Sequence, residues 1–285
     1  MKKILLTGAT GFIGSGIAKK LANQNKIYYI KRKKNKPINN SNRIKDIFYK
    51  NFDDLNKKLK KIKIDIVIHC ATHYVKKHNY QDIRKLAESN IIFGNIILEN
   101  INILKIKKFI NLTTVWENYD NQKDNSYNLY SAYKKSFTNI LNFYKKNNPK
   151  IKFYNVYLSD SFGKEDKRLK IINILKRNYK KNIPTKIISS KLYLNLLNVD
   201  DIASGISILV RKTMKSGNYN LVNPNYYSIS KIINQFNKKY KKKLNVKLLS
   251  HNLLKEKIFK NDSIKGWSPK ASKIKDLLKI IKDNK

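Results

Sequence analysis

The segment Lys3-Ile4-Leu5-Leu6-Thr7-Gly8-Ala9-Thr10-Gly11-Phe12-Ile13-Gly14 decides the fold of this chain. An apolar strand runs directly into three glycines spaced GxxGxxG, and a segment with helical periodicity follows. At such a junction the first glycine permits a tight turn, the second lets backbone N–H groups approach a pyrophosphate, and the third lets the helix pack against the strand. The helix N-terminus adds a positive dipole end. The spacing therefore predicts a dinucleotide site formed by Gly8, Thr10, Gly11, Phe12, Ile13 and Gly14.

Strand-like and helix-like segments alternate through the first half of the chain. Apolar stretches rich in Ile, Val, Tyr and Phe predict strands at 2–7, 26–30, 64–70, 108–114 and 151–157. Helical spacing of apolar residues occupies 12–25, 52–62, 82–104 and 127–146. This alternation implies right-handed crossovers and a parallel sheet covered on both faces. The predicted fold class is therefore α/β, with a Rossmann-type doubly wound parallel sheet.

The pattern changes after residue 157, where the loops lengthen. A strand is expected at 191–199, and helices are expected at 169–177, 200–211, 229–240 and 272–282. We predict a dinucleotide-binding Rossmann domain over 1–163, to which a segment near 189–211 returns. A smaller C-terminal α/β subdomain over 164–285 is expected to bind the substrate.

The chain is strongly basic, with 62 Lys and Arg against 19 Asp and Glu and a formal charge of +43 over 285 residues. Such a charge is typical of proteins that bind nucleic acid or anionic membranes. Here the lysines are scattered along every predicted helix, and no nucleic-acid motif accompanies them. Biased nucleotide composition explains the abundance of Lys, Asn, Ile and Tyr. We expect no specific nucleic acid partner, and binding to a polyanion that fades with salt stays an alternative.

Several features indicate a cytoplasmic protein without a metal. The apolar start of the chain breaks at Thr7-Gly8, and no apolar stretch reaches the roughly 18 residues that a spanning helix requires. Cys70 is the single cysteine, which excludes an intrachain disulfide and fits a reducing compartment. His69, His73 and His78 lie close in sequence, but no spacing of carboxylates or cysteines completes a metal site. We therefore expect no membrane partner and no metal.

Tyr130 and Lys134 form a candidate proton-transfer pair. Residues four apart on a helix share a face. An ammonium beside a phenol favours the phenolate and so lowers the pKa of the tyrosine from its usual value near 10. Such a phenol can take a proton from a sugar hydroxyl or give one to a ketone while hydride is transferred. Tyr29 and Lys33 have the same spacing, but Tyr29 falls inside a predicted strand. Tyr130 follows the strand that ends at Thr113 and Thr114.

The residues after the second predicted strand bear on which cofactor binds. A carboxylate is expected there for the ribose of NAD, whereas this chain has Lys31-Arg32-Lys33-Lys34. Cations at that point suit the 2′-phosphate of NADP. The pattern favours NADP(H) and leaves NAD(H) open, because any stretch of so basic a chain contains lysines.

With these motifs in place, the chain resembles the extended short-chain dehydrogenase/reductases of the NAD-dependent epimerase/dehydratase family. The resemblance extends from Thr7–Gly14 through 65–71, 89–95, 130–134, 161–163 and 199–201 to Gly266-Trp267-Ser268-Pro269. The run Phe109-Ile110-Asn111-Leu112-Thr113-Thr114-Val115-Trp116 is most similar to the branch of CDP-abequose and CDP-paratose synthases. Members of that branch reduce the 4-keto group of a nucleotide-linked deoxyhexose. The resemblance also implies a homodimer and a role in surface polysaccharide (lipopolysaccharide) biosynthesis.

The resemblance implies a role for each matching position. Tyr130 would be the proton donor or acceptor, and Lys134 would bind the nicotinamide ribose. Thr113 and Thr114 would be the remaining catalytic residues. The other positions would hold the cofactor (Cys70, Ala71 and Asn90, with Lys31 and Arg32 at the adenosine end) or the nucleotide-sugar substrate (Asp160, Arg168 and Lys170).

Two positions depart from the family pattern. The usual catalytic Ser or Thr is replaced by Leu112, which cannot form a hydrogen bond to the sugar, so Thr113 or Thr114 would take that role. Leu194 lies near the place of a diphosphate-binding arginine.

These departures leave three hypotheses. The first is a sugar-nucleotide 4-ketoreductase. The second is a 4-epimerase or dehydratase that uses the same residues, and Glu117 is the candidate second acid/base for dehydration. The third is a catalytically silent dinucleotide-binding regulator.

Overall fold

In the computed structural model, which describes residues 1–32 and 42–283, the quoted strand becomes β1 (Lys3–Thr7) near the middle of a sheet. The sheet has eight strands in the order β15-β11-β6-β5-β4-β1-β2-β3, and each neighbouring pair is parallel. Strand order reverses between β1 and β4, which is where doubly wound sheets bind their ligands. The predicted Rossmann-type α/β class is confirmed. The other strands of this sheet are β2 (Lys26–Lys31), β3 (Ile44–Phe48), β4 (Ile66–His69), β5 (Lys108–Thr114), β6 (Lys152–Leu158), β11 (Gly217–Leu221) and β15 (Asp262–Ser263).

The chain divides into two compact units. The first contains Met1–Leu158, Ile202–Leu221 and Ile258–Trp267, and the second contains Ser159–Asp201, Val222–Lys257 and Ser268–Lys285. The chain therefore returns to the first unit twice. The first return overlaps the predicted segment near 189–211, and the second lies beyond it.

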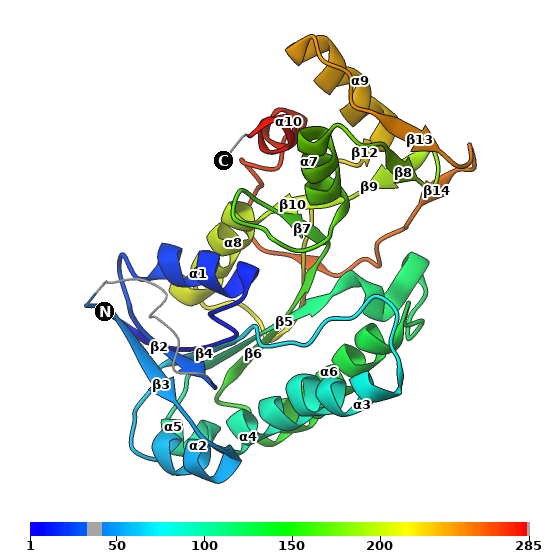
Figure 1. Cartoon of the computed structure of the whole chain (residues 1–285). Helices are drawn as coiled ribbons and strands as arrows, with labels where there is room; N and C mark the ends of the chain where they lie inside the picture. Colours follow the sequence, from blue (N-terminus) through cyan, green and yellow to red (C-terminus); the bar gives the residue numbers. More distant parts are fainter. Residues whose placement is uncertain (33–41, 284–285) are drawn as a thin grey trace. The chain divides into compact units, whose positions relative to one another are not determined.

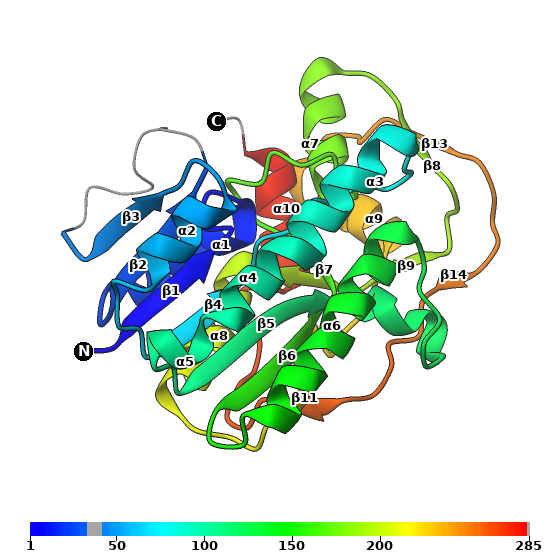
Figure 2. The ribbon, with the colours of Figure 1, turned by 90° about the horizontal axis from the view of Figure 1, so that it is seen from below.

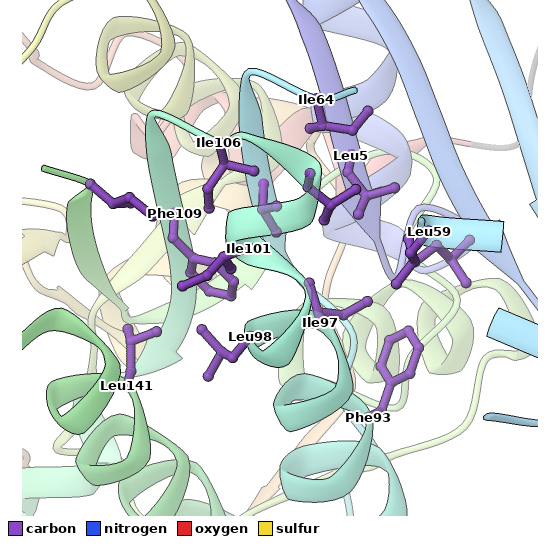
Figure 3. Close-up of a cluster of buried hydrophobic side chains, with 14 of the residues drawn as sticks. Leu5, Leu59, Ile64, Phe93, Ile97, Leu98, Ile101, Ile106, Phe109 and Leu141 are labelled. Atoms are coloured by element: carbon purple, nitrogen blue, oxygen red, sulfur yellow. The ribbon is translucent and has the colours of Figure 1, made fainter. Parts of the chain in front are cut away.

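Helices cover both faces of the sheet in the first unit (Figure 1). One face carries α1 (Phe12–Leu21) and the part of α8 (Val199–Arg211) that belongs to this unit. The other face carries α2 (Phe52–Leu59), α4 (Phe93–Glu99), α5 (Ile101–Leu104) and α6 (Leu129–Asn147). The main apolar core lies between the sheet and this second group of helices. There the strand residues Leu5 and Phe109 pack with Ile97, Leu98 and Ile101 (Figure 3).

The prediction of a single helix over 82–104 is wrong, because the structure divides this stretch into four helical segments. These are α3 (Tyr80–Ala87), a π-helical turn η1 (Glu88–Ile92), α4 and α5. A π turn holds an extra residue and so rotates the faces of the helices on either side. Ile83, one of the apolar residues of the predicted 82–104 segment, is 41% exposed.

Helices α4 and α6 lie side by side under the sheet (Figure 2). Gly94 permits this approach, because a Cβ atom there would lie 2.3 Å from the ring of Phe137. The close contact packs α6, the helix that carries Tyr130 and Lys134, against the buried core through Phe137.

The second unit has its own apolar core, which includes Phe162, Leu175, Leu196, Ile232 and Phe236. No helix among residues 1–32 and 42–283 is long and apolar enough to cross a membrane. The unit's elements are β7 (Asp160–Phe162), α7 (Ile171–Lys181), β8 (Thr185–Ile187), β9 (Leu192–Leu194), β10 (Leu196–Asn198), β12 (Tyr227–Ser228), α9 (Ile229–Tyr240), β13 (Val246–Leu248), β14 (Leu254–Lys255) and α10 (Ile274–Lys282).

Candidate active site

The glycine turn after β1 is a tight backbone cradle. Gly8 has φ +66°, and its carbonyl accepts a hydrogen bond from the N–H of Gly11 at 3.0 Å. A Cβ atom at Gly14 would lie 2.2 Å from that same carbonyl oxygen. Helix α1 begins after Gly11, and no side chain caps its N-terminus. The N-cap residue Gly11 therefore places no side-chain oxygen on the first turn of α1, as suits a helix that binds phosphate.

Thr7 joins the end of β1 to the end of β4. Its Oγ1 accepts hydrogen bonds from the backbone N–H groups of Cys70 and Ala71, both at 3.1 Å, and lies 3.0 Å from His69 Nδ1. Because Thr7 Oγ1 already accepts two N–H donors, its own hydroxyl proton is donated to His69 Nδ1. His69 is therefore a neutral acceptor at this nitrogen. Burial, together with the nearby charge of Lys134, lowers the pKa of His69 to about 3. His69 therefore positions the strand ends and is not a titrating group at neutral pH.

Asn90, on the π turn, anchors the loop that follows β4. Its Oδ1 accepts hydrogen bonds from the Thr72 hydroxyl at 2.7 Å and the His73 N–H at 2.9 Å, and its Nδ2 donates to the His73 carbonyl at 3.0 Å. The side chain is fully buried. Asn90, predicted to bind cofactor, thus shapes the loop next to Ala71 through three hydrogen bonds.

Helix α6 carries the predicted proton-transfer pair. It begins with a capping box between Asn128 and Ser131, which fixes the first turn. Tyr130 is half-buried and packs edge-on against the ring of Tyr74, with ring centres 5.0 Å apart. Lys134 is 2% exposed, and its ammonium has no hydrogen-bond acceptor within residues 1–32 and 42–283. Burial lowers the pKa of Lys134 to about 8, and the Glu117 carboxylate opposes this shift.

The two threonines at the end of β5 point to opposite faces of the sheet, as neighbouring strand residues do. The Thr113 hydroxyl donates to Glu117 Oε1, to which Thr138 of α6 also donates. Thr114 Oγ1 instead accepts the N–H of Trp116 at 3.3 Å, and its own proton has no acceptor among the described residues. Leu112 is buried at the position of the usual catalytic hydroxyl.

Glu117, on the turn η2 (Val115–Asn121), is fully buried. Burial raises the pKa of its carboxyl, whereas the Thr113 hydroxyl, the charge of Lys134 and the Thr138 hydroxyl oppose that rise. The sequence identified Glu117 only as a possible extra acid. It could not reveal the hydroxyl cage, because Thr138 lies 21 residues away on another element.

The adenosine end differs from the sequence prediction in one respect. Lys31 at the end of β2 forms an ion pair with Asp46 of β3 at 2.8 Å. A carboxylate therefore is present, supplied by the neighbouring strand rather than by the residues that follow β2. Arg32 is exposed, and Lys33 and Lys34 lie outside the described residues.

The three predicted substrate residues lie in the second unit, where Lys170 pairs with Asp160 and Arg168 pairs with Asp166. Lys170 Nζ lies 2.8 Å from Asp160 Oδ1. The Arg168 guanidinium binds the Asp166 carboxylate at 2.7 Å and the Ser161 carbonyl at 3.0 Å. These contacts hold two cations in defined positions.

The first unit fits a dinucleotide by two independent observations. The glycine cradle leaves no room for side chains, and a buried ammonium on α6 has no protein acceptor among the described residues. Ribose hydroxyls would accept hydrogen bonds from such an ammonium. Within the same residues, no group of three His, Cys, Asp or Glu could hold a metal ion.

Comparisons with known proteins agree with this geometry. A family model described as the NAD dependent epimerase/dehydratase family matches residues 4–223. A CDP-abequose synthase of Salmonella muenchen is 27% identical over 224 residues, which cover 77% of this chain and 74% of that protein. A dTDP-D-glucose 4,6-dehydratase of Dictyostelium discoideum is 31% identical over 256 residues, covering 78% of this chain and 58% of the dehydratase.

A solved structure has the same fold. It is UDP-glucuronic acid 4-epimerase from Bacillus cereus in complex with UDP-glucuronic acid and NAD, with a TM-score of 0.81 and 20% identity. The match covers 98% of this chain and 99% of the epimerase.

Proposed function

The chain is an enzyme of the NAD dependent epimerase/dehydratase family, whose model matches residues 4–223, and from this premise we propose that it is an NADP(H)-dependent 4-ketoreductase of a nucleotide-linked deoxyhexose. The buried Lys134 ammonium four residues after Tyr130 on α6 is the observation that carries the proposal. The similarity to CDP-abequose synthases at 27% and 28% identity supports the reductase.

In the proposed reaction, the glycine turn and Lys134 would hold a dinucleotide whose chemistry would be the supply of hydride to C4 of the sugar. Tyr130 gives its hydroxyl proton to the ketone oxygen, which becomes the C4 hydroxyl. Lys134, in its charged form, favours the resulting phenolate and donates hydrogen bonds to the nicotinamide ribose. The glycine turn holds the diphosphate through backbone N–H groups.

Thr114 is the better candidate for the hydroxyl that Leu112 cannot supply. Its proton has no acceptor among the described residues, so it can donate to the sugar oxygen. The Thr113 proton is already donated to Glu117.

The buried position of Glu117 also counts against dehydration. An additional acid for that reaction must reach the sugar, and a fully buried carboxylate held by two hydroxyls does not do so without rearrangement.

In the second unit, we propose that Asp160, Arg168 and Lys170 contact the nucleotide sugar. The guanidinium of Arg168 suits a diphosphate oxygen. Lys170 would share its charge between Asp160 and the ligand. A homodimer, a cytoplasmic location and a role in surface polysaccharide biosynthesis complete the proposal, as the sequence resemblance suggests.

Arg32 is proposed to select NADP(H). Lys31 is neutralised by Asp46, so Arg32 is the described cation at this strand end that can meet a 2′-phosphate. Arg32→Ala should lower kcat/KM for NADPH about tenfold, as expected for the loss of one charge-assisted hydrogen bond, and leave NADH unchanged. Steady-state kinetics with each cofactor measures this, with exposed Lys20→Ala as control. An equal loss with both cofactors would remove Arg32 from the 2′-phosphate site.

A turnover screen tests the function as a whole. The purified protein is incubated with CDP-, dTDP-, UDP- and GDP-linked 4-keto-deoxysugars and NADPH or NADH, and nicotinamide absorbance is followed. Stoichiometric loss of the reduced cofactor supports a reductase. Conversion of a nucleotide sugar without net change in absorbance would favour an epimerase or dehydratase instead. Cofactor binding with no conversion of any sugar would favour the silent regulator.

A further inference from the structure

The interior of the first unit contains a carboxylate in an unusual place. Glu117 is fully buried, its Oε1 accepts from the hydroxyls of Thr113 and Thr138, and its Oε2 has no hydrogen-bond partner among the described residues. Burial and the adjacent Glu117 carboxylate raise the pKa of the Tyr157 phenol. Burying an ionised carboxylate in this way destabilises the fold through lost hydration, unless a positive charge lies near it.

Lys134 is the cation that lies near this carboxylate. It precedes Thr138 by one turn on the same face of α6, and Thr138 donates to Glu117 at 3.1 Å. The two charges form no direct ion pair, so Glu117 does not occupy the hydrogen-bonding positions of the ammonium. Their attraction is nevertheless strong in a poorly solvated interior.

The other titratable groups around Lys134 add no net negative charge near neutral pH. Burial lowers the pKa of His69 to about 3 and raises that of Cys70 to about 12, so both are neutral. Lys135 is held by Asp124 at 2.6 Å. Glu117 is thus the carboxylate that acts on Lys134 within the described residues. Tyr130 lies one turn before the lysine on α6, and the Tyr157 phenol lies beside Glu117.

We propose that Glu117 is the buried counter-ion of Lys134, a positioning residue that keeps the lysine charged while leaving its three N–H donors for the cofactor ribose. This inference rests on the proposed function of Lys134. It gives Glu117 a role that needs no contact with the sugar, and it makes Thr113 and Thr138 the donors that keep the carboxylate ionised.

The pH dependence of cofactor binding tests the inference. The Kd of NADPH is measured by fluorescence titration between pH 6 and 10 for the wild type, Glu117→Gln and the control Glu99→Gln, whose carboxylate is exposed on α4. Wild-type affinity should fall as the pH rises through about 8, where Lys134 loses its proton. Removing the anion disfavours the ammonium, so in Glu117→Gln the midpoint should move to lower pH by about one unit, while Glu99→Gln should follow the wild type.

Two conservative variants separate charge from packing. Glu117→Asp keeps the charge and should move the midpoint less than Glu117→Gln does. Thr138→Val removes one hydrogen-bond donor from the Glu117 carboxylate and should move the pH midpoint in the same direction as Glu117→Gln, by a smaller amount. This variant also replaces Glu117→Gln in the test if Glu117→Gln does not fold. Coinciding wild-type and Glu117→Gln midpoints, or equal shifts for Asp and Gln, would overturn the inference. With Glu117→Gln unfolded, coinciding wild-type and Thr138→Val midpoints would do the same.

Failure of the proposed function has a different signature. If the wild type binds neither NADPH nor NADH, the function is wrong, and the apo protein still tests the charge pairing. The loss of melting temperature in Glu117→Gln should then be larger at pH 7 than at pH 10, where Lys134 is neutral in both proteins. A loss that is equal at both pH values would contradict the pairing.

Discussion

Replacing Tyr130 with phenylalanine is expected to lower kcat by about 10²- to 10⁴-fold, the range typical of a lost general acid. The substitution removes only the hydroxyl, so the edge-on packing of the ring against Tyr74 is retained. Lys134 and the glycine turn are unchanged. Turnover is followed by nicotinamide absorbance, and the Kd of NADPH, which should stay within about twofold of the wild type, is measured in parallel.

Tyr133→Phe is the matched control for this experiment. It makes the same chemical change three residues along α6, at a half-buried tyrosine, and should leave kcat unaltered. Thr114→Val gives an intermediate case, because losing one hydrogen-bond donor to the sugar should lower kcat by about 10- to 100-fold. Full activity in Tyr130→Phe would refute the proposed proton transfer.

Gly8→Ala is expected to abolish cofactor binding and to destabilise the fold. Gly8 has φ +66°, a conformation that costs about 1–2 kcal/mol for a residue with a side chain. The new Cβ would also lie 2.6 Å from the Ala71 nitrogen and 2.7 Å from the Cys70 carbonyl carbon. Both are backbone atoms and cannot swing away, so overpacking adds about 1–3 kcal/mol. We expect a total loss of about 2–5 kcal/mol in the free energy of unfolding.

Urea denaturation and NADPH titration measure the two effects. Displacement of the turn from β4 should weaken binding by at least about 100-fold, because several backbone donors lose their alignment together. Gly217→Ala is the control: no atom lies within 4 Å of its Cβ position, so its stability should stay within about 0.5 kcal/mol of the wild type. An alanine at position 8 that preserved both affinity and stability would show that the cradle is not what binds the cofactor.

The strands of the sheet differ in how well the sequence pattern predicted them. Strands β1, β4, β5 and β6 are almost wholly buried, each contains at least three buried apolar residues, and all were predicted. Strand β3 was missed, because it lies at the edge of the sheet and contains Lys45 and Asp46. An edge strand buries less side-chain surface, so its sequence need not be apolar. The short β15, which pairs with β11, was missed for the same reason.

In the candidate site too, the residues related by short sequence spacing were predicted, and those brought together from distant segments were not. The glycine turn and the Tyr130–Lys134 pair depend on spacing within one turn or one helix, and both were predicted. Asp46, the acid beside Lys31, was not, because it enters through pairing between β2 and β3. The roles of Thr113 and Thr114 could not be separated in advance, since their difference depends on which residues cover each face of the sheet.

The sequence by itself predicted the parts of this protein that depend on neighbouring residues: the alternation of helices with the central strands β1, β4, β5 and β6, the glycine turn, and the spacing of Tyr130 and Lys134 on α6. Periodicity and glycine spacing express local backbone geometry, which is written directly in consecutive residues. Only the tertiary structure decided that Glu117 meets Thr138, that Asp46 meets Lys31 and that Thr114 keeps its proton available. Those contacts depend on strand register and helix packing between distant segments, and hence on the free energy of the whole fold.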